Sequence, residues 1–329
     1  MSSRPTIADV ATAAGVGLGT ASRALNDSGY VAADTKKKVL DAAARLGYKP
    51  NAVARALQSA RSGIIGLLSP DLENEYYIVS TAAIQRELAS KGYQLMVAVA
   101  NTAEEEAAAL DTFGNQHVDG IIHIPVDPAT PLPTTIPIVQ INRSSQGTTV
   151  AAIVCDEAIG IDSLTRHLLA SGTASHLALI VGAKKHSTTA KRIAGFTTAT
   201  ADADVTTHVY SGEFTPQWGE EAARKALADG ADAIIAASPR IALGVVHELE
   251  RRGVRIPADC QLASYSDPDW FSMWKPGMTT FVPPLREMGH LAVLTLLARI
   301  DSPTPHPDSP AITSLPGQIV VRGSTLAKE

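Results

Sequence analysis

The N-terminal segment carries one side chain well suited to polar recognition, the guanidinium of Arg23. Thr20, Ser22 and Asn26 lie beside it in the sequence and add short hydroxyl and amide groups. A guanidinium can donate two parallel hydrogen bonds to O6 and N7 of a guanine, and short polar side chains suit phosphate oxygens. The alternative is that Arg23 only clamps a phosphate, which would carry no sequence information. These residue types suit nucleic acid, and the folding and charge of the segment must decide whether it is the partner.

The residue types of enzyme active sites occur without the spacing that catalysis requires. The nine histidines are scattered, and a single one such as His123 or His290 is typical of a packing residue with satisfied hydrogen bonds. The sequence has no Gly-x-Gly-x-x-Gly after an expected strand, no Walker loop and no Gly-x-Ser-x-Gly elbow. No group of residues has metal-ligand spacing. We therefore expect no catalytic residue, no metal and no cofactor.

The polar residues around Arg23 lie in a segment with helical periodicity. The expected helices are Ile7–Ala14, Leu18–Leu25 and roughly Thr35–Leu46. Gly15 and Gly29 separate them, and Thr6 is a suitable N-cap for the first helix, with Asp9 three residues later. Two short helices around a glycine turn favour a helix-turn-helix, although an ordinary amphipathic helix pair has the same pattern.

Charge is divided unevenly along the chain. The whole sequence has 28 Lys and Arg against 33 Asp and Glu, a net of −5 that by itself argues against nucleic acid. Residues 1–62, however, hold nine basic and four acidic side chains, a net of +5, so the remainder carries −10. The basic part is the part that contains Arg23, which supports a nucleic-acid partner for this segment alone.

After residue 62 short apolar runs alternate with amphipathic segments. The expected strands are Ile64–Leu68, Gln94–Ala100, Gly120–Ile124, Pro137–Ile141, Ala151–Val154, Leu177–Val181, Thr206–Tyr210, Ala233–Ala237, Gln261–Tyr265 and a return strand at Met278–Val282. The expected helices are Ile78–Lys91, Glu104–His117, Ile159–Ser171, Gln217–Ala228 and Ala242–Arg252. This alternation predicts parallel sheets covered on both faces. About ten strands are many for one sheet, so we expect two doubly wound subdomains.

Cysteine usage and hydropathy place the protein inside the cell. Cys155 and Cys260 have apolar neighbours, which indicates buried reduced thiols rather than a disulfide. The longest apolar run, around Leu291–Ile300, is well short of the roughly 18 residues that a membrane span needs. Met1–Pro5 has no apolar signal core. We expect a cytoplasmic, nucleoid-associated protein with no membrane partner.

Four sequence blocks occur together in the N-terminal segment. They are Thr6 to Val16, Thr20 to Asn26, Gly29 to Val31 and Leu46 to Asn51. With these blocks the segment resembles the DNA-binding headpiece of the lactose/galactose repressor family. The resemblance places Leu18, Gly19 and Arg23 where a recognition helix faces base edges, although Gly19 has no side chain for readout. Gly17 and Ala32 stand where the family often has capping serines, which costs stability.

The resemblance continues into the family's hinge helix. Asn51 to Leu57 reads Asn-Ala-Val-Ala-Arg-Ala-Leu. The resemblance implies that two hinge helices enter the minor groove and wedge Leu57 into a base step, whereas the alternative is that Leu57 packs the headpiece against the core. A helix this short is marginal in water, so we expect it to form only with DNA and a partner helix. The implied DNA contacts are Thr6, Leu18, Gly19, Thr20, Ser22, Arg23, Asn26, Tyr30, Asn51, Ala54, Arg55 and Leu57.

Residues 63–329 resemble the family's periplasmic-binding-protein-like core. The matching blocks are Ile64 to Asp71, Val118 to Ile122, Ile141 to Arg143, Val154 to Asp156 and Arg192 to Phe196. The resemblance implies that Arg192 binds an effector and that Phe214 lines its pocket. An arginine beside an aromatic plate suits a polyhydroxylated ring. Without the resemblance, Arg192 is typical of a surface salt bridge and Phe214 of a core aromatic. Tyr76, Tyr77 and Asn142 are further effector-binding candidates.

Two departures from the family pattern concern the same pocket. Ser238 precedes Pro239 where the family usually has Asn-Asp, and Ser266 stands where it often has an aspartate. Both serines can hydrogen-bond a hydroxyl and remain effector-binding candidates. Neither supplies the carboxylate that pairs with two hydroxyls at once in a standard pentose or hexose pocket.

The resemblance implies a dimeric transcription regulator, most often a repressor. It would bind a palindromic DNA operator with an affinity set by a sugar, nucleoside or polyol in the cleft of the core. The expected parts are a headpiece (1–50), a hinge helix and linker (51–62) and a core (63–329). The core divides into an N-subdomain of about 63–158 and 284–329 and a C-subdomain of about 159–283. The resemblance implies a homodimer, and because the sequence after Val321 has no leucine heptads, we expect no tetramerising helix. The alternative is a doubly wound sugar- or nucleotide-modifying enzyme with a fused DNA-binding head.

Overall fold

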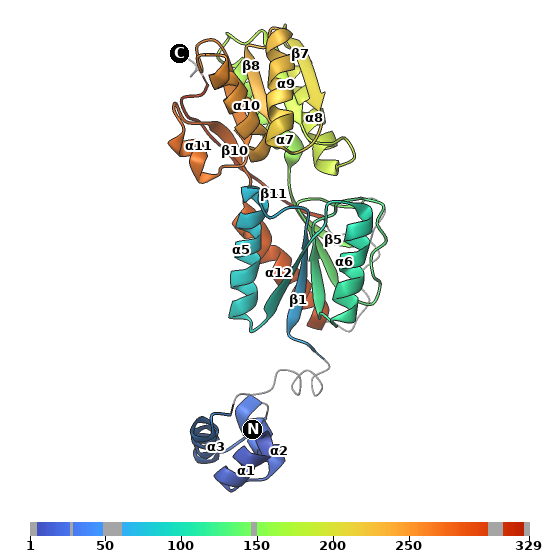
Figure 1. Cartoon of the computed structure of the whole chain (residues 1–329), viewed down its shortest axis with the longest axis vertical. Coiled ribbons are helices and arrows are strands. Elements are labelled where there is room, and N and C mark those ends of the chain that lie inside the picture. The colour runs from blue at the N-terminus through green and yellow to red at the C-terminus, as the bar shows by residue number, and fades with distance from the viewer. Residues whose placement is uncertain (1–4, 27–28, 49–60, 146–149, 302–311, 326–329) are drawn as a thin grey trace. The chain divides into compact units, whose positions relative to one another are not determined.

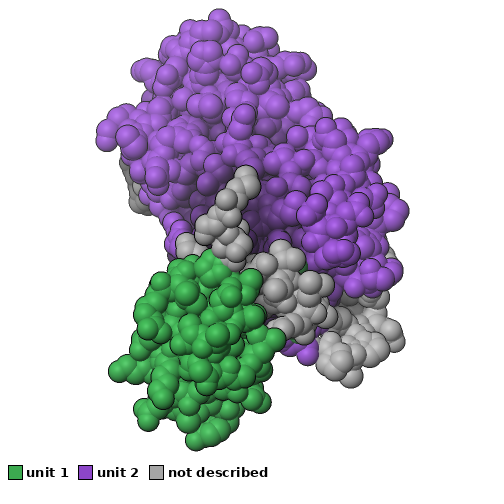
Figure 2. Space-filling view, turned by 60° about the horizontal axis from the view of Figure 1, so that its bottom comes forward, with its two compact units in different colours: residues 1–62 green, residues 63–329 purple. Residues whose placement is uncertain are grey.

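The computed structural model describes residues 5–26, 29–48, 61–145, 150–301 and 312–325. The chain divides into two compact units, Met1–Ser62 and Gly63–Glu329, which Figure 2 distinguishes by colour. No helix in the described ranges is long and apolar enough to cross a membrane.

The first unit is a three-helix headpiece with a core of small side chains. Its helices are α1 (Ile7–Ala14), α2 (Leu18–Asn26) and α3 (Ala33–Leu46). The buried core residues are Val10, Ala11, Ala21, Ala24, Val39, Ala42 and Ala43. Because most of these side chains are short, the three helices pack closely.

The ends of α1 agree with the sequence prediction, whereas α2 ends one residue later, at Asn26, and α3 begins about two residues earlier, at Ala33. At the start of α1, the Asp9 amide donates to Thr6 Oγ1 (3.4 Å) and the Thr6 amide donates to Asp9 Oδ2 (2.7 Å), which completes the expected capping box. Gly15 then has φ = 67°, a left-handed conformation that favours glycine, and turns the chain into α2. Ala32 makes no side-chain cap at the start of α3.

The first sheet of the core has the strand order β11-β5-β4-β3-β1-β2, with every pair parallel. Its strands are β1 (Ile64–Ser69), β2 (Gln94–Val99), β3 (Gly120–His123), β4 (Ile138–Ile141), β5 (Ala151–Cys155) and β11 (Ile312–Leu315). Its helices are α5 (Glu75–Ser90), α6 (Ala103–Asn115) and α12 (Leu285–Asp301). Helices α5 and α12 pack together on one face, and α6 covers the other (Figure 1). Every residue of β3, β4 and β5 is buried, as in a sheet covered on both faces.

The second sheet has the order β12-β10-β9-β8-β6-β7, parallel except for the pair β10 and β12. Its strands are β6 (His176–Val181), β7 (Thr206–Ser211), β8 (Ala233–Ala236), β9 (Gln261–Tyr265), β10 (Thr279–Val282) and β12 (Gln318–Val320). Its helices are α7 (Glu157–Leu169), α8 (Ser187–Thr200), α9 (Pro216–Ala228), α10 (Pro239–Arg251) and α11 (Asp269–Met273). Helix α7 packs on α8, and α9 packs on α10 (Figure 1).

The chain passes between the two sheets three times, once more than the sequence predicted. The crossings follow β5, β10 and β11. The third crossing corrects the expected N-subdomain, which included all of 284–329, because β12 pairs with β10 in the second sheet. The segment after β12 stays there, since the Thr279 amide donates to Ser324 Oγ (2.8 Å).

Candidate functional site

Helix α2 presents an exposed face in the headpiece. Leu18 is 56% exposed in its first turn, and Gly19 and Arg23 are also exposed. The Arg23 stem passes over Gly29, where an added Cβ would lie 3.6 Å from Arg23 Cδ. The guanidinium makes no hydrogen bond or ion pair with another described residue, so its donors remain available to a ligand.

The other predicted DNA contacts of the headpiece differ in accessibility. Thr20 and Ser22 are half-buried on α2, Asn26 is the last residue of that helix, and Tyr30 is 93% exposed. The Thr6 hydroxyl donates to Asp9 Oδ2 (2.8 Å), so it is already engaged within the capping box. The predicted hinge contacts lie outside the described residues; they are Asn51, Ala54, Arg55 and Leu57.

The core has a cleft between its two sheets, with an inner and an outer cavity. The inner cavity has a volume of about 20 Å³, room for about one water. Its lining comes from the first subdomain at Asn74, Tyr76, Tyr77, Asn142 and Arg143 and from the second at Thr188, Arg192, Phe214, Ala237, Ser238, Pro239 and Tyr265. The outer cavity has a volume of about 540 Å³, which is in the usual range for a small-molecule site. The two cavities share Asn74, Tyr77, Arg143 and Phe214.

Six of the seven predicted effector-binding residues line the inner cavity. They are Tyr76, Tyr77, Asn142, Arg192, Phe214 and Ser238. These residues come from α5, from the end of β4, from α8, from the segment after β7 and from the end of β8. The carboxyl ends of the strands and the helix starts that follow them therefore converge on the cleft, as in other open parallel sheets.

On the side of the first subdomain, the start of α5 places two tyrosines. Asn74 caps the helix by accepting from the Tyr76 amide (3.1 Å), and the Tyr76 and Tyr77 rings pack edge to face, 5.3 Å apart. The Tyr76 hydroxyl donates to Asn142 Oδ1 (2.9 Å). Burial raises the pKa of Tyr76 well above its ordinary value, and the Glu157 carboxylate adds to this, so the hydroxyl keeps its proton.

Arg192 is held by a buried ion pair. Its Nε donates to Glu157 Oε2 (2.6 Å), its Nη1 donates to the Ala237 carbonyl (2.5 Å), and its guanidinium lies over the Tyr265 ring, 4.2 Å from the centroid. Burial alone would lower the pKa of the guanidinium, but the Glu157 charge raises it above its ordinary value. The salt-bridge alternative for Arg192 is thus half correct, because the pair exists but is buried rather than on the surface.

Phe214 and Ser238 form part of the opposite wall. The Phe214 ring lies so close to Gly182 that a Cβ there would overlap it, and the His186 ring is 5.9 Å away. Ser238 Oγ accepts from the Ile241 amide (3.2 Å) and so caps α10, with Pro239 at the first helical position. The serine that departs from the family pattern therefore has a role at a helix start.

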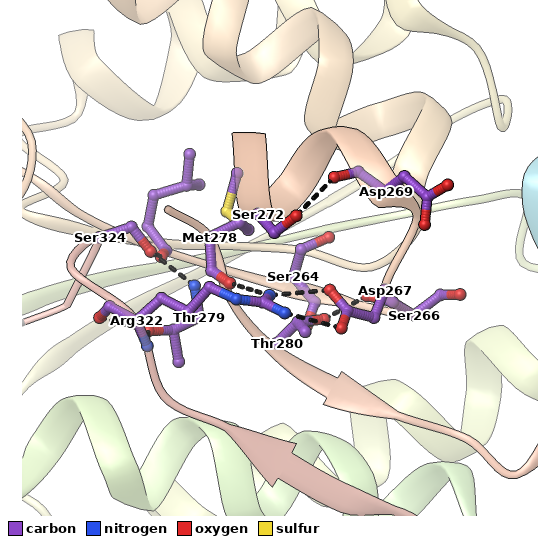
Figure 3. Close-up of polar contacts among 11 residues, drawn as sticks. Ser264, Ser266, Asp267, Asp269, Ser272, Met278, Thr279, Thr280, Arg322 and Ser324 are labelled. Carbon is purple, nitrogen blue, oxygen red and sulfur yellow. Dashed lines mark hydrogen bonds and ion pairs between the residues drawn. The ribbon is translucent and has the colours of Figure 1, made fainter. Parts of the chain in front are cut away.

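Ser266 is the exception among the predicted effector-binding residues, because it lies outside the cavity lining. It has φ = 76° after β9, and its amide donates to the Phe281 carbonyl (2.7 Å) while its own carbonyl accepts from Thr280 Oγ1. The next residue, Asp267, forms a two-pronged ion pair with Arg322 (2.7 and 2.8 Å), shown in Figure 3. This segment ties β9 and β10 to the end of the described chain.

Sequence reasoning missed several lining residues. Arg143, Thr188 and Tyr265 line the inner cavity, and His186 lines the outer one. Arg143 directly follows Asn142 at the end of β4, and this position beside a predicted effector contact was enough to predict that Arg143 lines the cleft. Cys155 and Cys260 are buried free thiols, as expected, and burial raises their pKa values to about 11 and about 12.

Comparison with known families identifies the chain. The profile of bacterial regulatory proteins of the lacI family matches residues 6–51, and that of a periplasmic binding protein-like domain matches residues 165–325. The ribose operon repressor of Bacillus subtilis (strain 168) is 33% identical over 308 residues, which cover 90% of this chain and 91% of that protein. The chain belongs to the lacI family of bacterial regulatory proteins. Members of the lacI family are DNA-binding transcription regulators, which excludes the enzyme alternative.

Solved structures of the lacI family confirm the predicted fold class. The Lac repressor dimer bound to operator and the anti-inducer ONPF has a TM-score of 0.86 at 26% identity, covering 99% of this chain and 100% of that chain. A putative lacI-family repressor from Corynebacterium glutamicum has a TM-score of 0.72 at 35% identity, covering 80% and 98%. A helix-turn-helix headpiece followed by a two-subdomain core is thus common to this chain and the Lac repressor.

Proposed function

We propose that this lacI-family protein is a repressor that binds a palindromic operator as a homodimer and senses a small polyhydroxylated effector in the cleft. The observation that carries the proposal is the convergence of six predicted residues from both subdomains on one cavity. Three chain crossings connect the subdomains, and such connections can act as a hinge when a ligand binds between them. We further propose a cytoplasmic, nucleoid-associated location.

For DNA we propose that α2 of residues 1–50 enters the major groove, with Leu18, Gly19 and Arg23 towards the bases. Thr20, Ser22, Asn26 and Tyr30 would lie near phosphates, whereas the amide and the hydroxyl of Thr6 both donate to Asp9 Oδ2 and are not free for a phosphate. Residues 51–62 would form the hinge, with Asn51, Ala54, Arg55 and Leu57 in the minor groove. The exposed leucine on α2 supports this orientation, because a thymine methyl can cover an apolar side chain.

The DNA proposal is tested by selecting operator sequences from random DNA and measuring affinity by fluorescence anisotropy. We expect a two-fold-symmetric site, and Arg23→Ala should lose preference at one guanine of each half-site, about 1–3 kcal/mol. Arg23→Lys separates base readout from phosphate binding, because a lysine keeps the charge without the planar fork. If Arg23→Lys retains full preference at that guanine, Arg23 is only a phosphate contact.

The effector proposal is tested by a thermal-shift screen of sugars, nucleosides and polyols, followed by operator binding with each hit. A true effector should change operator affinity by a coupling of about 1–3 kcal/mol. Phe214→Ala should abolish this response and leave operator affinity without ligand unchanged, since Phe214 lines the cleft and belongs to the core unit. A variant that responds like the parent would refute the assigned pocket.

A further inference from the structure

Among the described residues, two arginines and no carboxylate line the inner cavity. The charge of Arg192 is neutralised by Glu157, whose Oε2 lies 2.6 Å from Arg192 Nε. Arg143 is 6% exposed and is not neutralised: its Nη1 donates to the Pro125 carbonyl (2.9 Å), its Nη2 donates to the Tyr77 hydroxyl (2.9 Å), and no described carboxylate lies within ion-pair distance. Among the described residues, the inner cavity therefore holds a buried guanidinium that no carboxylate contacts.

A buried guanidinium without a counter-charge is unfavourable unless a ligand supplies one. Arginine has five N–H donors, and the two bonds of Arg143 go to neutral oxygens. Phe214 adds only a distant ring face, 6.0 Å from the Arg143 guanidinium to the centroid. Asn142 lies beside it with Nδ2 buried and without any acceptor among the described residues. Both side chains thus offer donors to the cavity.

The opposite wall adds a positive helix end. Helix α8 is 14 residues long and begins at Ser187, its N-cap His186 makes no side-chain cap, and its first turn has no acidic residue. Thr188 lines the inner cavity, while His186 and Lys185 line the outer one. Burial, together with the charges of Arg143, Lys185 and Arg192, lowers the pKa of His186 to about 3. The field at this wall is therefore positive, although His186 itself is neutral at physiological pH.

The acidic side chains of the cleft line only the outer cavity. They are Asp71, Glu73 and Glu213. Glu73 faces Arg240 at 3.3 Å, and Asp71 Oδ1 accepts from the Glu73 amide (2.6 Å), so two of the three are engaged locally. Tyr77, Phe214 and Arg143 line both cavities. A ligand in the outer cavity can thus place its ring near the two aromatic side chains and an anionic group against Arg143.

We propose that the effector is a phosphate ester of a sugar-sized molecule that lies in the outer cavity, with its phosphate against Arg143, one of the four residues that line both cavities. This inference rests on the proposed function, because it specifies the ligand of the same cleft. A phosphate suits the site better than a carboxylate, since it offers more oxygens to the Arg143 donors and its charge approaches −2. The neutral form of the same sugar would leave Arg143 without a counter-charge.

The test uses the full-length dimer and matched probes. Inorganic phosphate, ribose with ribose 5-phosphate, glucose with glucose 6-phosphate, and gluconate as the carboxylate probe are compared by thermal shift and calorimetry. Phosphate should raise the melting temperature of the core transition, and a phosphorylated sugar should bind at least about tenfold more tightly than its neutral partner. Arg143→Gln should abolish both effects. Arg166→Gln, which removes the same charge from the exposed face of α7, should retain them.

A second variant keeps the test valid if Arg143→Gln does not fold. Asn142→Asp is isosteric, and aspartate tolerates the positive φ of 68° at this position. It replaces the free Nδ2 donor by a carboxylate beside Arg143, so it should supply the counter-charge internally. We expect Asn142→Asp to lose the phosphate shift and the preference for phosphorylated sugars.

The outcomes separate this inference from the proposed function. A neutral sugar that alters operator affinity, bound no more weakly than its phosphate ester and unaffected by Asn142→Asp, would overturn the inference and leave effector control standing. Gluconate bound more tightly than every phosphate ester would also overturn it. A phosphate ester that binds through Arg143 without changing operator affinity would support the site and refute effector control. If inorganic phosphate raises the melting temperatures of the parent and of Arg143→Gln equally, phosphate binds at another site and the inference is wrong.

Discussion

At the scale of single residues, the fully buried Glu106 organises the loop that follows β3. Its carboxylate accepts hydrogen bonds from the amides of Val126 (2.8 Å) and Asp127 (3.0 Å) and from Thr130 Oγ1 (2.6 Å), and it pairs with His123 Nε2 (2.7 Å). Burial alone would raise the pKa of Glu106, but these hydrogen bonds lower it to about 2 from an ordinary 4.5. His123, expected to be a satisfied packing residue, is one member of this network.

The lowered pKa of Glu106 predicts an acid-dependent loss of stability. Because the folded pKa lies below the ordinary one, the contribution of Glu106 is complete above pH 4.5 and is lost as the pH falls from 4.5 to about 2. Glu106→Gln should lower the free energy of unfolding of the core at pH 7 by about 1–3 kcal/mol, since an amide cannot satisfy every donor. It should also flatten the pH dependence in that window, measured by urea unfolding.

The control for this prediction is Glu104→Gln, on the same helix. Glu104 is exposed, so its removal changes the net charge equally without opening the network. It should leave the free energy of unfolding nearly unchanged. An identical pH profile for Glu106→Gln and the parent would mean that the network does not couple stability to pH.

At the scale of elements, two glycines permit the close packing of α9 on α10. A Cβ at Gly244 would overlap the Pro216 carbonyl, and a Cβ at Gly219 would overlap the Ile241 carbonyl. Gly244→Ala should therefore force the helices apart and destabilise the core by about 1–3 kcal/mol, which thermal unfolding measures. Ser238, which lines the inner cavity, caps the start of α10. A shift of α10 should therefore move Ser238 and lower ligand affinity as well.

Gly114→Ala is the matched control for Gly244→Ala. Gly114 also lies in a helix, α6, but a Cβ there would meet nothing within 4 Å. The substitution should be neutral or stabilise the core by up to about 1 kcal/mol, since alanine loses less backbone entropy than glycine. Equal effects of the two substitutions would show that helix propensity, not close packing, governs position 244.

Ten of the twelve described strands, β1 to β10, were predictable, because parallel strands appear as apolar runs bounded by turns. Helix starts were less so: α5 begins at Glu75 rather than Ile78, since the Asn74 cap leaves no periodic signal. Helix α12 was missed because its run of apolar residues has little periodicity, packing on α5 and on the sheet at once. The strands β11 and β12 are short and partly exposed, and so carry no alternation.

The candidate site was predictable only where the family resemblance supplied positions. Tyr76, Asn142 and Arg192 were expected in the cleft, but the Glu157 partner of Arg192 was not. That pair joins residues 35 positions apart, so no local pattern indicates it. Ser266 was misplaced because its backbone, with φ = 76°, returns the chain towards β10, and this cannot be inferred from residue type.

At the scale of the whole molecule, the division of charge sets how DNA affinity depends on salt. The first 62 residues carry +5 and the remainder −10, so we expect favourable contacts with phosphates in the first unit and not in the core. The logarithm of the operator association constant should fall linearly with the logarithm of salt concentration, with a slope of about −0.9 per phosphate contacted.

Two lysine variants test this expectation. Lys37→Gln, at an exposed position of α3, should make the slope shallower by up to about 0.9, the value for one phosphate contact. Lys225→Gln, which removes an exposed charge from α9 of the core, should leave the slope unchanged, because the core is not expected to touch phosphate. Anisotropy titrations between 50 and 200 mM salt, about a thousandfold change in affinity for six contacts, resolve the difference. Equal changes in slope for the two lysines would mean that net charge, rather than a basic headpiece on an acidic core, governs binding.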